Sequence, residues 1–560
     1  MVQEPRGDDQ PARTLPGMNV FLHAVASFEP TSSGVLLWTR LSGASEAAWV
    51  VTRDPDMVDV VASGRTETGS ERDHTVVVDV EGLTAATSYW YRFSAGGADS
   101  PVGRTRTLPG APADRLRLGL ACCAHFSVAP LGVYRALAER EVDLVVHLGD
   151  YLYEDDGSQG VRPHRPPRPA VSLDDYRDRL AQLREDPDLQ ALHLRHPMTG
   201  IWDDHDLADN AWRDGAKKHD PQAQGAWSTR AGAAARARQE WLPARLRDPA
   251  DPLVTWRSVA VGDLIELLLL DTRLTGRDRQ AGDEGTKPLH DPSRSLLGDD
   301  QREWLRTRLL DGSRPWALVG SGVVVNSMCL PLPSIVGFNP LLPNGYADFD
   351  GQLIHDDQWD GYPAERERLV GWMQERAQAG GRTLLVSGDV HSSWAFEGPC
   401  RGDEPVAVEV TVPAVSSAAM GRAHYPGAWR VLDRAVNRMD HVRWAEVTER
   451  GYAVLNVTPD EARVEWWFVH PYHDRPADTA ELAKAFVTRR ADWPPCFHPS
   501  EDPSVDPSRP GLPEPLPDRP DDLPALRRRR RLRLVAELTG AATVIGAPIA
   551  LVAHRLRSRR

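Results

Sequence analysis

The sequence predicts an α/β domain that follows a small β-sandwich of immunoglobulin or fibronectin type III character. Between Asn19 and about Pro109 the apolar segments are short, bounded by turns and rich in Val, Trp and Tyr, without a 3.6-residue period. From Leu116 onward, strand-like runs alternate with helical segments, as they do in α/β folds. We expect the sandwich at 19–110, the α/β domain at 114–492, a linker at 493–526 and a tail at 527–560.

The individual elements are predicted from the same patterns. Strands of the sandwich are expected within the apolar runs 20–28, 34–41, 47–53, 74–83 and 88–96. In the α/β part, Leu116–Cys122 predicts a strand, Gly132–Arg140 a helix and Val142–Leu148 a second strand. Further runs of buried-strand character are Asp263–Leu270, Trp316–Val325 and Arg382–Ser387.

The bulk composition is that of a folded globular protein. At 560 residues the chain exceeds one compact core, so two or more folded units are expected. Hydrophobic residues make up 41% and charged residues 26%, which argues against disorder throughout. The formal net charge of −14 argues against dedicated nucleic-acid binding. Five cysteines without a C-x-x-C spacing argue against a disulfide scaffold.

The two ends of the chain give a prediction about location. Met1–Gly17 has acids, prolines and no apolar core, so no signal peptide is predicted and the protein is expected to be cytoplasmic. The linker is rich in proline and acids and is expected to be extended. Leu534–Ala553 has about the 20-residue length that spans a bilayer, and basic clusters flank it. It is either a membrane anchor or a helix docked on the main domain.

Three turns carry residue types that bind metal ions. They are GDYLYED at Gly149–Asp155, WDDHD at Trp202–Asp206 and GDVH at Gly388–His391, and each follows a hydrophobic run. One such turn would be ordinary turn or helix-capping chemistry. Three of them predict one site, because the carboxyl ends of parallel strands converge on one crevice. The sequence therefore indicates a metal-dependent hydrolase.

Two-metal hydrolysis of a phosphate ester needs a bridging carboxylate and flanking ligands from several strands. Asp150 is the best bridging candidate because it follows the strongest β run, and a turn could bring Tyr153 to the same ion. Asp389 and His391 are separated by one residue, so their side chains would share a face of an extended chain.

Three further candidates complete the predicted site. Asp204 and His205 are adjacent after the run MTGIW, and Cys123 ends the first α/β strand, where a thiolate would suit a ferric or other thiophilic ion. Taken singly, each has a structural alternative: a cysteine in a strand is usually a small buried hydrophobe, and a histidine is usually hydrogen-bonded or at the surface.

These motifs resemble those of the PhoD-type alkaline phosphatases, a branch of the calcineurin-like metallophosphoesterase superfamily. The resemblance runs from about Phe21 to about Trp467. It rests on an ordered set: HAVASFEPTSSGVLLWTRL at His23–Leu41, ACC at Ala121–Cys123, GDYLYE at Gly149–Glu154, WDDHD at Trp202–Asp206, LDTR at Leu270–Arg273, LGDDQREWL at Leu297–Leu305, DQWDGYPAER at Asp357–Arg366 and GDVHSSW at Gly388–Trp394. It implies a four-layer αββα domain with an iron–calcium site that cleaves phosphodiesters and some monoesters.

The resemblance also implies roles for individual residues. Those that would surround Fe³⁺ are Cys123, Asp150, Tyr153, Asp389 and His391. Asp150 would also bridge to Ca²⁺, with Asp204 in the shell of that second metal. His205 has the position of the acid–base histidine, which would stabilise or protonate the leaving-group oxygen.

The sequence departs from the family pattern near both predicted metals. Cys122 stands where the family often has serine, which leaves open which sulfur binds. The family's WDDHE is WDDHD here, and the nearby asparagine occurs as Asp209–Asn210, so the calcium ligand is open. In a cytoplasmic enzyme, Mn²⁺, Mg²⁺ or Zn²⁺ are alternatives for the second site.

Asn210 and Arg273 are candidates for contact with substrate or an accessory metal, and Arg366 for phosphate binding. For each arginine, an ion pair with a neighbouring carboxylate is the alternative. The favoured function is hydrolysis of small-molecule phosphate esters. The alternatives are phospholipase-like or phosphotriester hydrolysis, with membrane contact through the tail, and a non-catalytic adhesion or scaffold role.

Overall fold

The computed structural model of the chain describes residues 19–158, 160–282, 285–329, 346–349, 352–424, 429–501, 518 and 523–531. Met1–Gly17, most of the predicted linker and the apolar run Leu534–Ala553 lie outside this part of the chain. Within it, no helix combines the length and the apolar character that crossing a membrane requires. Residues 523–531 are helical, and Leu526 packs there against Ala129 and Tyr472.

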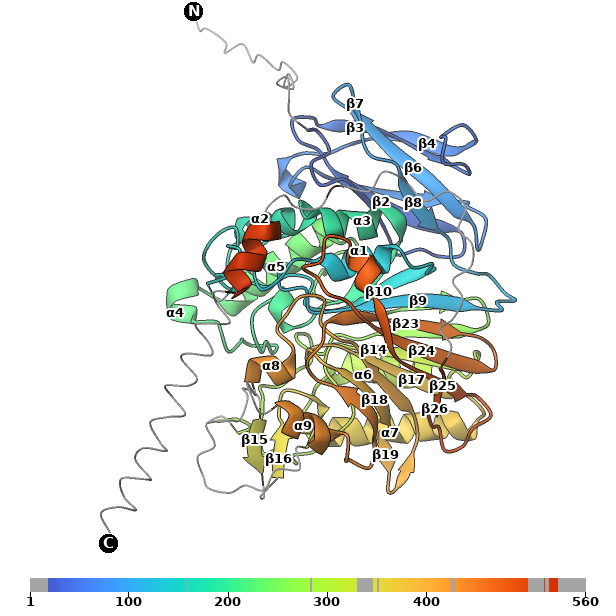
Figure 1. Cartoon of the computed structure of the whole chain (residues 1–560), viewed down its shortest axis with the longest axis vertical. Coiled ribbons are helices and arrows are strands. Elements are labelled where there is room, and N and C mark those ends of the chain that lie inside the picture. Colours follow the sequence, from blue (N-terminus) through green and yellow to red (C-terminus); the bar gives the residue numbers. More distant parts are fainter. Residues whose placement is uncertain are drawn as a thin grey trace, which may run out of the picture.

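A ten-stranded sheet runs through both predicted folded units (Figure 1). Its central strands β9, β10 and β11 are parallel, and β23 and the strands beyond it are antiparallel. In spatial order the strands are β26 (His498–Pro499), β25 (Glu481–Arg489), β24 (Glu461–Phe468), β23 (Gly451–Val457), β9 (Leu116–Ala121), β10 (Leu144–Leu148), β11 (Met198–Ile201), β1 (Val25–Phe28), β2 (Gly34–Arg40) and β5 (Thr75–Glu81).

A seven-stranded sheet faces the first one. Its strands β13, β14, β17 and β21 are parallel, and its two ends are antiparallel. In spatial order the strands are β12 (Arg257–Val261), β13 (Ile265–Leu269), β14 (Trp316–Ser321), β17 (Arg382–Ser387), β21 (Val408–Thr411), β18 (Ser393–Glu397) and β22 (Val442–Glu446).

Side chains along each strand point alternately to the inner and the outer face of its sheet, and this produces separate core layers. Leu144, Val146 and Leu148 point into a core between the two sheets, because side chains alternate between faces along a strand. Val145 points the other way, toward the helices that cover the ten-stranded sheet. On the seven-stranded sheet, Leu385 likewise belongs to an outer core with helices α6 and α7. This arrangement confirms the predicted four-layer αββα domain.

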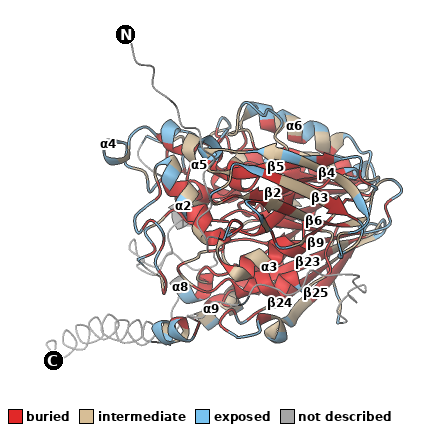
Figure 2. Ribbon diagram, turned by 90° about the horizontal axis from the view of Figure 1, so that it is seen from above, coloured by how far each residue is buried: buried red, intermediate tan, exposed pale blue. Residues whose placement is uncertain are grey.

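Helices cover the outer face of each sheet (Figure 1). Those on the ten-stranded sheet are α1 (Gly132–Ala138), α2 (Leu173–Arg184), α3 (Pro187–Arg195) and α5 (Trp227–Trp241). Those on the seven-stranded sheet are α6 (Gly298–Leu310) and α7 (Pro363–Gln378). Buried residues, red in Figure 2, fill strands such as β9 and β23 and the faces of the helices that pack on them.

The β-sandwich shares its second sheet with the α/β domain. Strands β1, β2 and β5 pack against a sheet of five short strands, around a core that includes Val35, Val51 and Tyr91. Strand β1 then pairs in parallel with β11 through Phe28 and Met198, so the ten-stranded sheet continues across the join. The five short strands are β3 (Glu46–Thr52), β4 (Val60–Glu67), β6 (Ser88–Ala95), β7 (Ala98–Asp99) and β8 (Gly103–Arg106).

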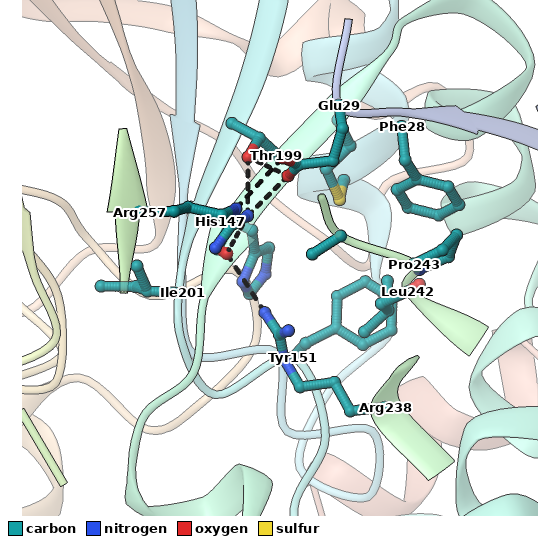
Figure 3. Close-up of a pocket in the computed structure, with 13 residues that line it drawn as sticks. Phe28, Glu29, His147, Tyr151, Thr199, Ile201, Arg238, Leu242, Pro243 and Arg257 are labelled. Carbon is teal, nitrogen blue, oxygen red and sulfur yellow. Dashed lines mark hydrogen bonds and ion pairs between the residues drawn. The ribbon is translucent and has the colours of Figure 1, made fainter. Parts of the chain in front are cut away.

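A buried polar network fixes this join (Figure 3). The Glu29 carboxylate accepts hydrogen bonds from Arg257 Nε at 3.1 Å and from Thr199 Oγ1 at 2.5 Å. Arg238 donates to the Gly200 carbonyl oxygen at 3.2 Å across the same cavity of about 20 Å³, which has room for about one water molecule. None of the predicted metal ligands lines this cavity.

Several predicted strands are shorter than expected: Val142–Leu148 forms β10 only from Leu144, and Asp263–Leu270 forms β13 only over Ile265–Leu269. The run Trp316–Val325 forms β14 only as far as Ser321. Beyond that point the backbone N–H of Val325 donates to the buried Glu409 carboxylate at 2.9 Å instead of to a neighbouring strand. A side chain thus satisfies the backbone there, so the apolar run leaves the sheet.

Candidate metal centre

The three turns predicted from the sequence meet at one edge of the stacked sheets. The turns after β10 and β11 come from the ten-stranded sheet, whereas the turn after β17 comes from the seven-stranded one. Glycines permit the close approach. Gly149 has φ +98°, and a Cβ there would lie 2.5 Å from Asp203 Cβ. A Cβ at Gly388 would lie 3.1 Å from the Leu148 carbonyl oxygen, on the other sheet.

The first group of candidate ligands contains sulfur, oxygen and nitrogen. Ligand atoms of Cys123, Asp150 and His391 all lie within 4.8 Å of one another. The Tyr153 hydroxyl lies 2.7 Å from Asp150 Oδ2 and 3.1 Å from His391 Nε2. The structure thus brings together four of the five residues that were predicted around the first ion; the fifth, Asp389, clusters instead with Asp203 and Asp204. A thiolate, a phenolate, a carboxylate and an imidazole suit a thiophilic, highly charged cation.

Hydrogen bonds orient this group. His391 Nδ1 lies 3.1 Å from the carbonyl oxygen of Ala418, which can only accept, so Nδ1 carries the proton and Nε2 presents its lone pair to the site. Ser417 Oγ lies 2.7 Å from the Tyr153 hydroxyl and 2.9 Å from the Cys123 carbonyl oxygen. Ser417 stands in no metal-binding motif and was not predicted from the sequence.

The two adjacent cysteines have different surroundings. Cys122 Sγ donates a weak hydrogen bond to the Val412 carbonyl oxygen at 3.4 Å, and the side chain packs in the core between the sheets. Cys123 Sγ, in contrast, lies within 4.8 Å of ligand atoms of Asp150 and His391, close enough for the three to bind one ion. The geometry therefore favours Cys123 as the ligand.

A second group of candidate ligands adjoins the first. Asp150, Asp204 and His205 form one cluster, and Asp203, Asp204 and Asp389 form another, each within 4.8 Å. Asp150 belongs to both the sulfur-containing group and this one, as a bridging ligand would. Asp203 Oδ2 and Asp204 Oδ1 are buried and have no hydrogen-bond partner within the described part of the chain, although Arg273 Nη2 lies 3.7 Å from Asp204 Oδ1. Orphaned carboxylate oxygens of this kind fit a bound cation, which would satisfy them.

The turns hold their ligands in left-handed backbone conformations. The φ angles are 58° at Cys123, 55° at Asp150, 64° at Asp389 and 51° at His391. This corrects the expectation that Asp389 and His391 share a face of an extended chain. Non-glycine residues rarely adopt positive φ, and such strain is typical of functional sites.

Asp206 supports the bridging candidate from behind. Its carboxylate accepts hydrogen bonds from four backbone N–H groups: those of Asp150 at 2.8 Å, Tyr151 at 3.0 Å, Leu152 at 3.2 Å and Asp203 at 2.9 Å. It therefore joins the turn after β10 to the turn after β11. This is the position at which the sequence departs from WDDHE.

Arg273 lies at the centre of the acidic side of the site. Its guanidinium is wholly buried and forms ion pairs with Asp203, with Asp357 at 2.7 Å, with Asp389 at 3.0 Å and with Asp204 at 3.7 Å. Burial alone would lower its pKa, but the carboxylates outweigh burial and raise the pKa well above its ordinary value. These contacts match the structural alternative, in which the arginine orients carboxylates; a substrate contact stays a prediction.

Asn210 and Arg366, the other two candidates for substrate or metal contact, also lie near carboxylates. The backbone N–H of Asn210 donates to Asp204 Oδ2 at 2.6 Å, so Asn210 lies beside the second group. A metal or substrate contact of its side chain stays a prediction. Arg366 forms an ion pair with Asp360, which again matches the structural alternative.

His205 is paired with a carboxylate that the sequence analysis did not single out. Its Nδ1 lies 2.7 Å from Glu154 Oε2, and its backbone N–H donates to Asp150 Oδ1 at 3.2 Å. Burial alone would lower the pKa of His205, but Glu154, Asp204 and Asp150 outweigh burial and raise it well above its ordinary value. In the metal-free protein these carboxylates therefore favour the protonated ring. Its side chain is 22% exposed, so it borders solvent.

The acids of the site are crowded and buried. Burial raises the pKa of Asp150 well above its usual range, and that of Asp203 likewise, with neighbouring carboxylates adding to both shifts. Burial and neighbouring Asp204 raise the pKa of Asp389 to about 6, against the lowering effect of Arg273. Like charges held together at this cost are typical of functional sites. The donor set thus fits two cations.

Aromatic stacking holds Tyr153. Its ring lies between those of His125, with centroids 4.1 Å apart, and His205, with centroids 4.3 Å apart. His125 in turn pairs with Asp155 at 3.0 Å, next to His164. Although these last three residues cluster, Arg179 Nη1 lies 2.8 Å from His164 Nδ1, so a guanidinium already occupies the position a cation would need.

Comparisons with known proteins identify relatives of the whole arrangement. A model of the PhoD-like phosphatase family matches residues 118–466, and a model of the PhoD-like phosphatase N-terminal domain matches residues 8–109. The chain is 30% identical over 504 residues to alkaline phosphatase D of Bacillus subtilis strain 168, which covers 84% of this chain and 81% of the relative. A solved structure of PhoD superposes with a TM-score of 0.72 at 25% identity, covering 95% of this chain and all of the other.

Proposed function

The chain belongs to the PhoD-like phosphatase family of metal-dependent phosphoesterases, and on this premise we propose that its site cleaves small phosphodiesters and phosphomonoesters. The observation that carries the proposal is the pair of adjoining ligand groups that meet at Asp150. A single group would hold one ion, whereas two groups with a common carboxylate suit the two-metal hydrolysis of phosphate esters.

We propose Fe³⁺ for the group of Cys123, Asp150, Tyr153, Asp389 and His391, and Ca²⁺ for the group around Asp204. Anionic sulfur and phenolate donors favour the first assignment, and the predominance of carboxylate oxygens around Asp204 favours the second. Mn²⁺, Mg²⁺ or Zn²⁺ are the alternatives at the second position. When bound, such cations would neutralise the phosphoryl oxygens and lower the pKa of water.

The protein's own groups would do the remaining work. His205 would act as the general acid: Glu154 Oε2 lies 2.7 Å from Nδ1 and favours the protonated ring, which leaves Nε2 to donate a proton to the leaving-group oxygen. Arg273 holds Asp203 and Asp389 in place through its ion pairs. Tyr153 is fixed by stacking, so the ligand geometry requires little reorganisation when the substrate binds.

The test compares a chromogenic phosphodiester with its matching monoester. Purified protein is assayed with iron and calcium, and separately with manganese, magnesium or zinc in place of calcium. Asp150→Asn should abolish turnover of both esters, whereas Asp156→Asn, at an exposed acid six residues along the chain, should not. Metal content and the thermal midpoint are measured on each variant, so that loss of ions or of folding is recognised.

The outcomes separate the alternatives. Full activity in Asp150→Asn, or no activity on either ester by folded, metal-loaded protein, would overturn the proposal. Phospholipid vesicles provide a third substrate. Faster cleavage of the phospholipid than of the soluble diester would favour the phospholipase-like function instead.

A further inference from the structure

A second cluster of metal-binding residue types lies at the edge of the ten-stranded sheet, apart from the site above. Asp492, Cys496 and His498 have ligand atoms within 4.8 Å of one another. They come from the turn between β25 and β26 and from the first residue of β26. None of them belongs to the motifs that identified the family.

A hydrogen bond explains the contact of His498 with Asp492 but leaves the Cys496 thiol with only a weak partner. His498 Nε2 lies 2.8 Å from Asp492 Oδ2 and 3.5 Å from Cys496 Sγ. One imidazole nitrogen has either a proton or a lone pair. If Nε2 carries a proton, it donates to Asp492, and the thiol finds no acceptor there. If Nε2 carries a lone pair, it accepts from the thiol but is repelled by the Asp492 carboxylate. A cation between the three atoms would satisfy all of them.

The surrounding fold holds the three side chains in this arrangement. The backbone N–H of Phe497 donates to Glu397 Oε1 at 2.8 Å, and the Phe497 ring packs in the core beside Phe486, with centroids 5.4 Å apart. Cys496 and His498 flank this anchor, two residues apart. Pairing of His498 with Val487 then fixes the histidine in β26.

The cluster is also accessible; the guanidinium groups of Arg382, Arg443 and Arg489 influence it electrostatically. The side chain of His498 is 40% exposed and that of Asp492 is 24% exposed, so an ion can enter from solvent. Within the described part of the chain, the only ion pair of Asp492 is with His498. This differs from the cluster of His125, Asp155 and His164, where Arg179 is present.

We propose that Asp492, Cys496 and His498 bind a thiophilic divalent cation of the Zn²⁺ class. Sulfur and imidazole donors select such an ion over Ca²⁺ or Mg²⁺, and three protein ligands leave one position of a tetrahedral ion for water. Strand β26 has only two residues, so a metal that joins His498 to the preceding turn would secure the edge of the sheet.

The test uses Co²⁺ as a spectroscopic probe on the full-length chain. One equivalent of Co²⁺ should give a sulfur-to-cobalt charge-transfer band that Zn²⁺ abolishes. Because Cys123 could also bind cobalt, the band is taken as the difference between wild type and Cys496→Ser. A parallel pair carries Cys123→Ser in both proteins. Cys400→Ser, at another half-buried cysteine, is the matched control and should keep the band.

Amide hydrogen exchange provides a second measurement, which does not depend on the cobalt absorption band. Zn²⁺ should slow amide hydrogen exchange in residues 482–499 at least tenfold in the wild type and leave it unchanged in His498→Gln. A charge-transfer band of equal intensity with and without Cys496→Ser in the Cys123→Ser background, or exchange that Zn²⁺ does not alter in the wild type, would overturn the proposal. The three groups would then be an ion pair beside a thiol.

Discussion

The backbone N–H of Asp150 donates a hydrogen bond to Asp206 Oδ2 at 2.8 Å, so one carboxylate positions another. Asp206 also accepts from Tyr151, Leu152 and Asp203, and it is 4% exposed. The predicted bridging ligand therefore depends on a residue that belongs to none of the metal clusters.

Asp206→Asn should destabilise the protein and weaken metal binding. The carboxamide turns an N–H₂ toward backbone donors, and buried donors left without acceptors cost about 2–4 kcal/mol in total. Denaturant unfolding and metal titration measure the two effects. Asp206→Glu keeps both acceptor oxygens and should lose less. Equal stability of Asp206→Asn and wild type would show that the hydrogen bonds to Asp206 contribute little.

Cys123→Ser should remove the sulfur-to-iron charge-transfer absorption of the iron-loaded protein, and Cys122→Ser should keep it. The reason is that Cys123 lies with Asp150 and His391, whereas the Cys122 thiol points to the Val412 carbonyl oxygen in the core. Visible absorption spectra of the two variants decide between the sulfurs. Loss of the band only in Cys122→Ser would reverse the assignment.

His205→Asn should slow esters with poor leaving groups more than esters with good ones, by about 10²–10⁴-fold for the poorest. Rates across a series of substituted phenyl esters measure this. Glu154 raises the pKa of His205, so the acid form persists to higher pH in the wild type. Glu154→Gln should therefore move the alkaline decline of the rate to lower pH. A uniform loss across the series would contradict proton donation.

Metal removal should make stability fall as pH rises. In the metal-free protein the folded pKa of Asp389 is about 6, above its unfolded value of 3.8, mainly because of burial. The folded state then binds more protons than the unfolded chain between about pH 4 and 6, so stability is lost as pH rises through that range. Urea unfolding with and without chelator measures the difference. Asp389→Asn should make the metal-free profile less steep, since Asp150 and Asp203 still contribute, and an unaltered slope would contradict this account.

His147 gives the opposite dependence. Burial lowers its pKa from 6.5 to about 3, and its Nε2 pairs with the Tyr134 hydroxyl at 2.7 Å. The unfolded chain binds the proton first, so stability is lost as pH falls from about 6.5 toward 3. His147→Gln keeps a polar group near Tyr134 without titrating. Its unfolding free energy should fall less steeply than that of wild type over this range; parallel profiles would refute the assignment.

The motifs predicted the site because its ligands stand in short segments after apolar runs. Cys123, Asp150, Asp204 and His391 could be found in this way, since each turn is readable without knowledge of its partners. Asp206 and Ser417 could not be assigned, because their roles depend on which turns come together. The same holds for the left-handed backbone at Asp389, which turn sequence alone did not reveal.

Strand positions could be predicted where local sequence determines them, but not where a distant residue ends the strand. Strand β17 has the predicted bounds, Arg382–Ser387, because its apolar run is flanked by turn residues. Strand β14 ends earlier than predicted because the Glu409 carboxylate, 84 residues away in sequence, accepts the hydrogen bond of the Val325 backbone N–H. Such a contact has no local signal.

The parallel pairing of β1 with β11 means that the amino-terminal sandwich is not an interchangeable module. Excising it would leave β11 as an exposed edge strand of the remaining sheet, with unpaired N–H and C=O groups available to other chains. Grafting the sandwich of a relative would have to reproduce both the Phe28–Met198 register and the Glu29–Arg257 pair. We therefore expect that the sandwich and the α/β domain depend on each other for stability, and that loss of the sandwich promotes aggregation through β11.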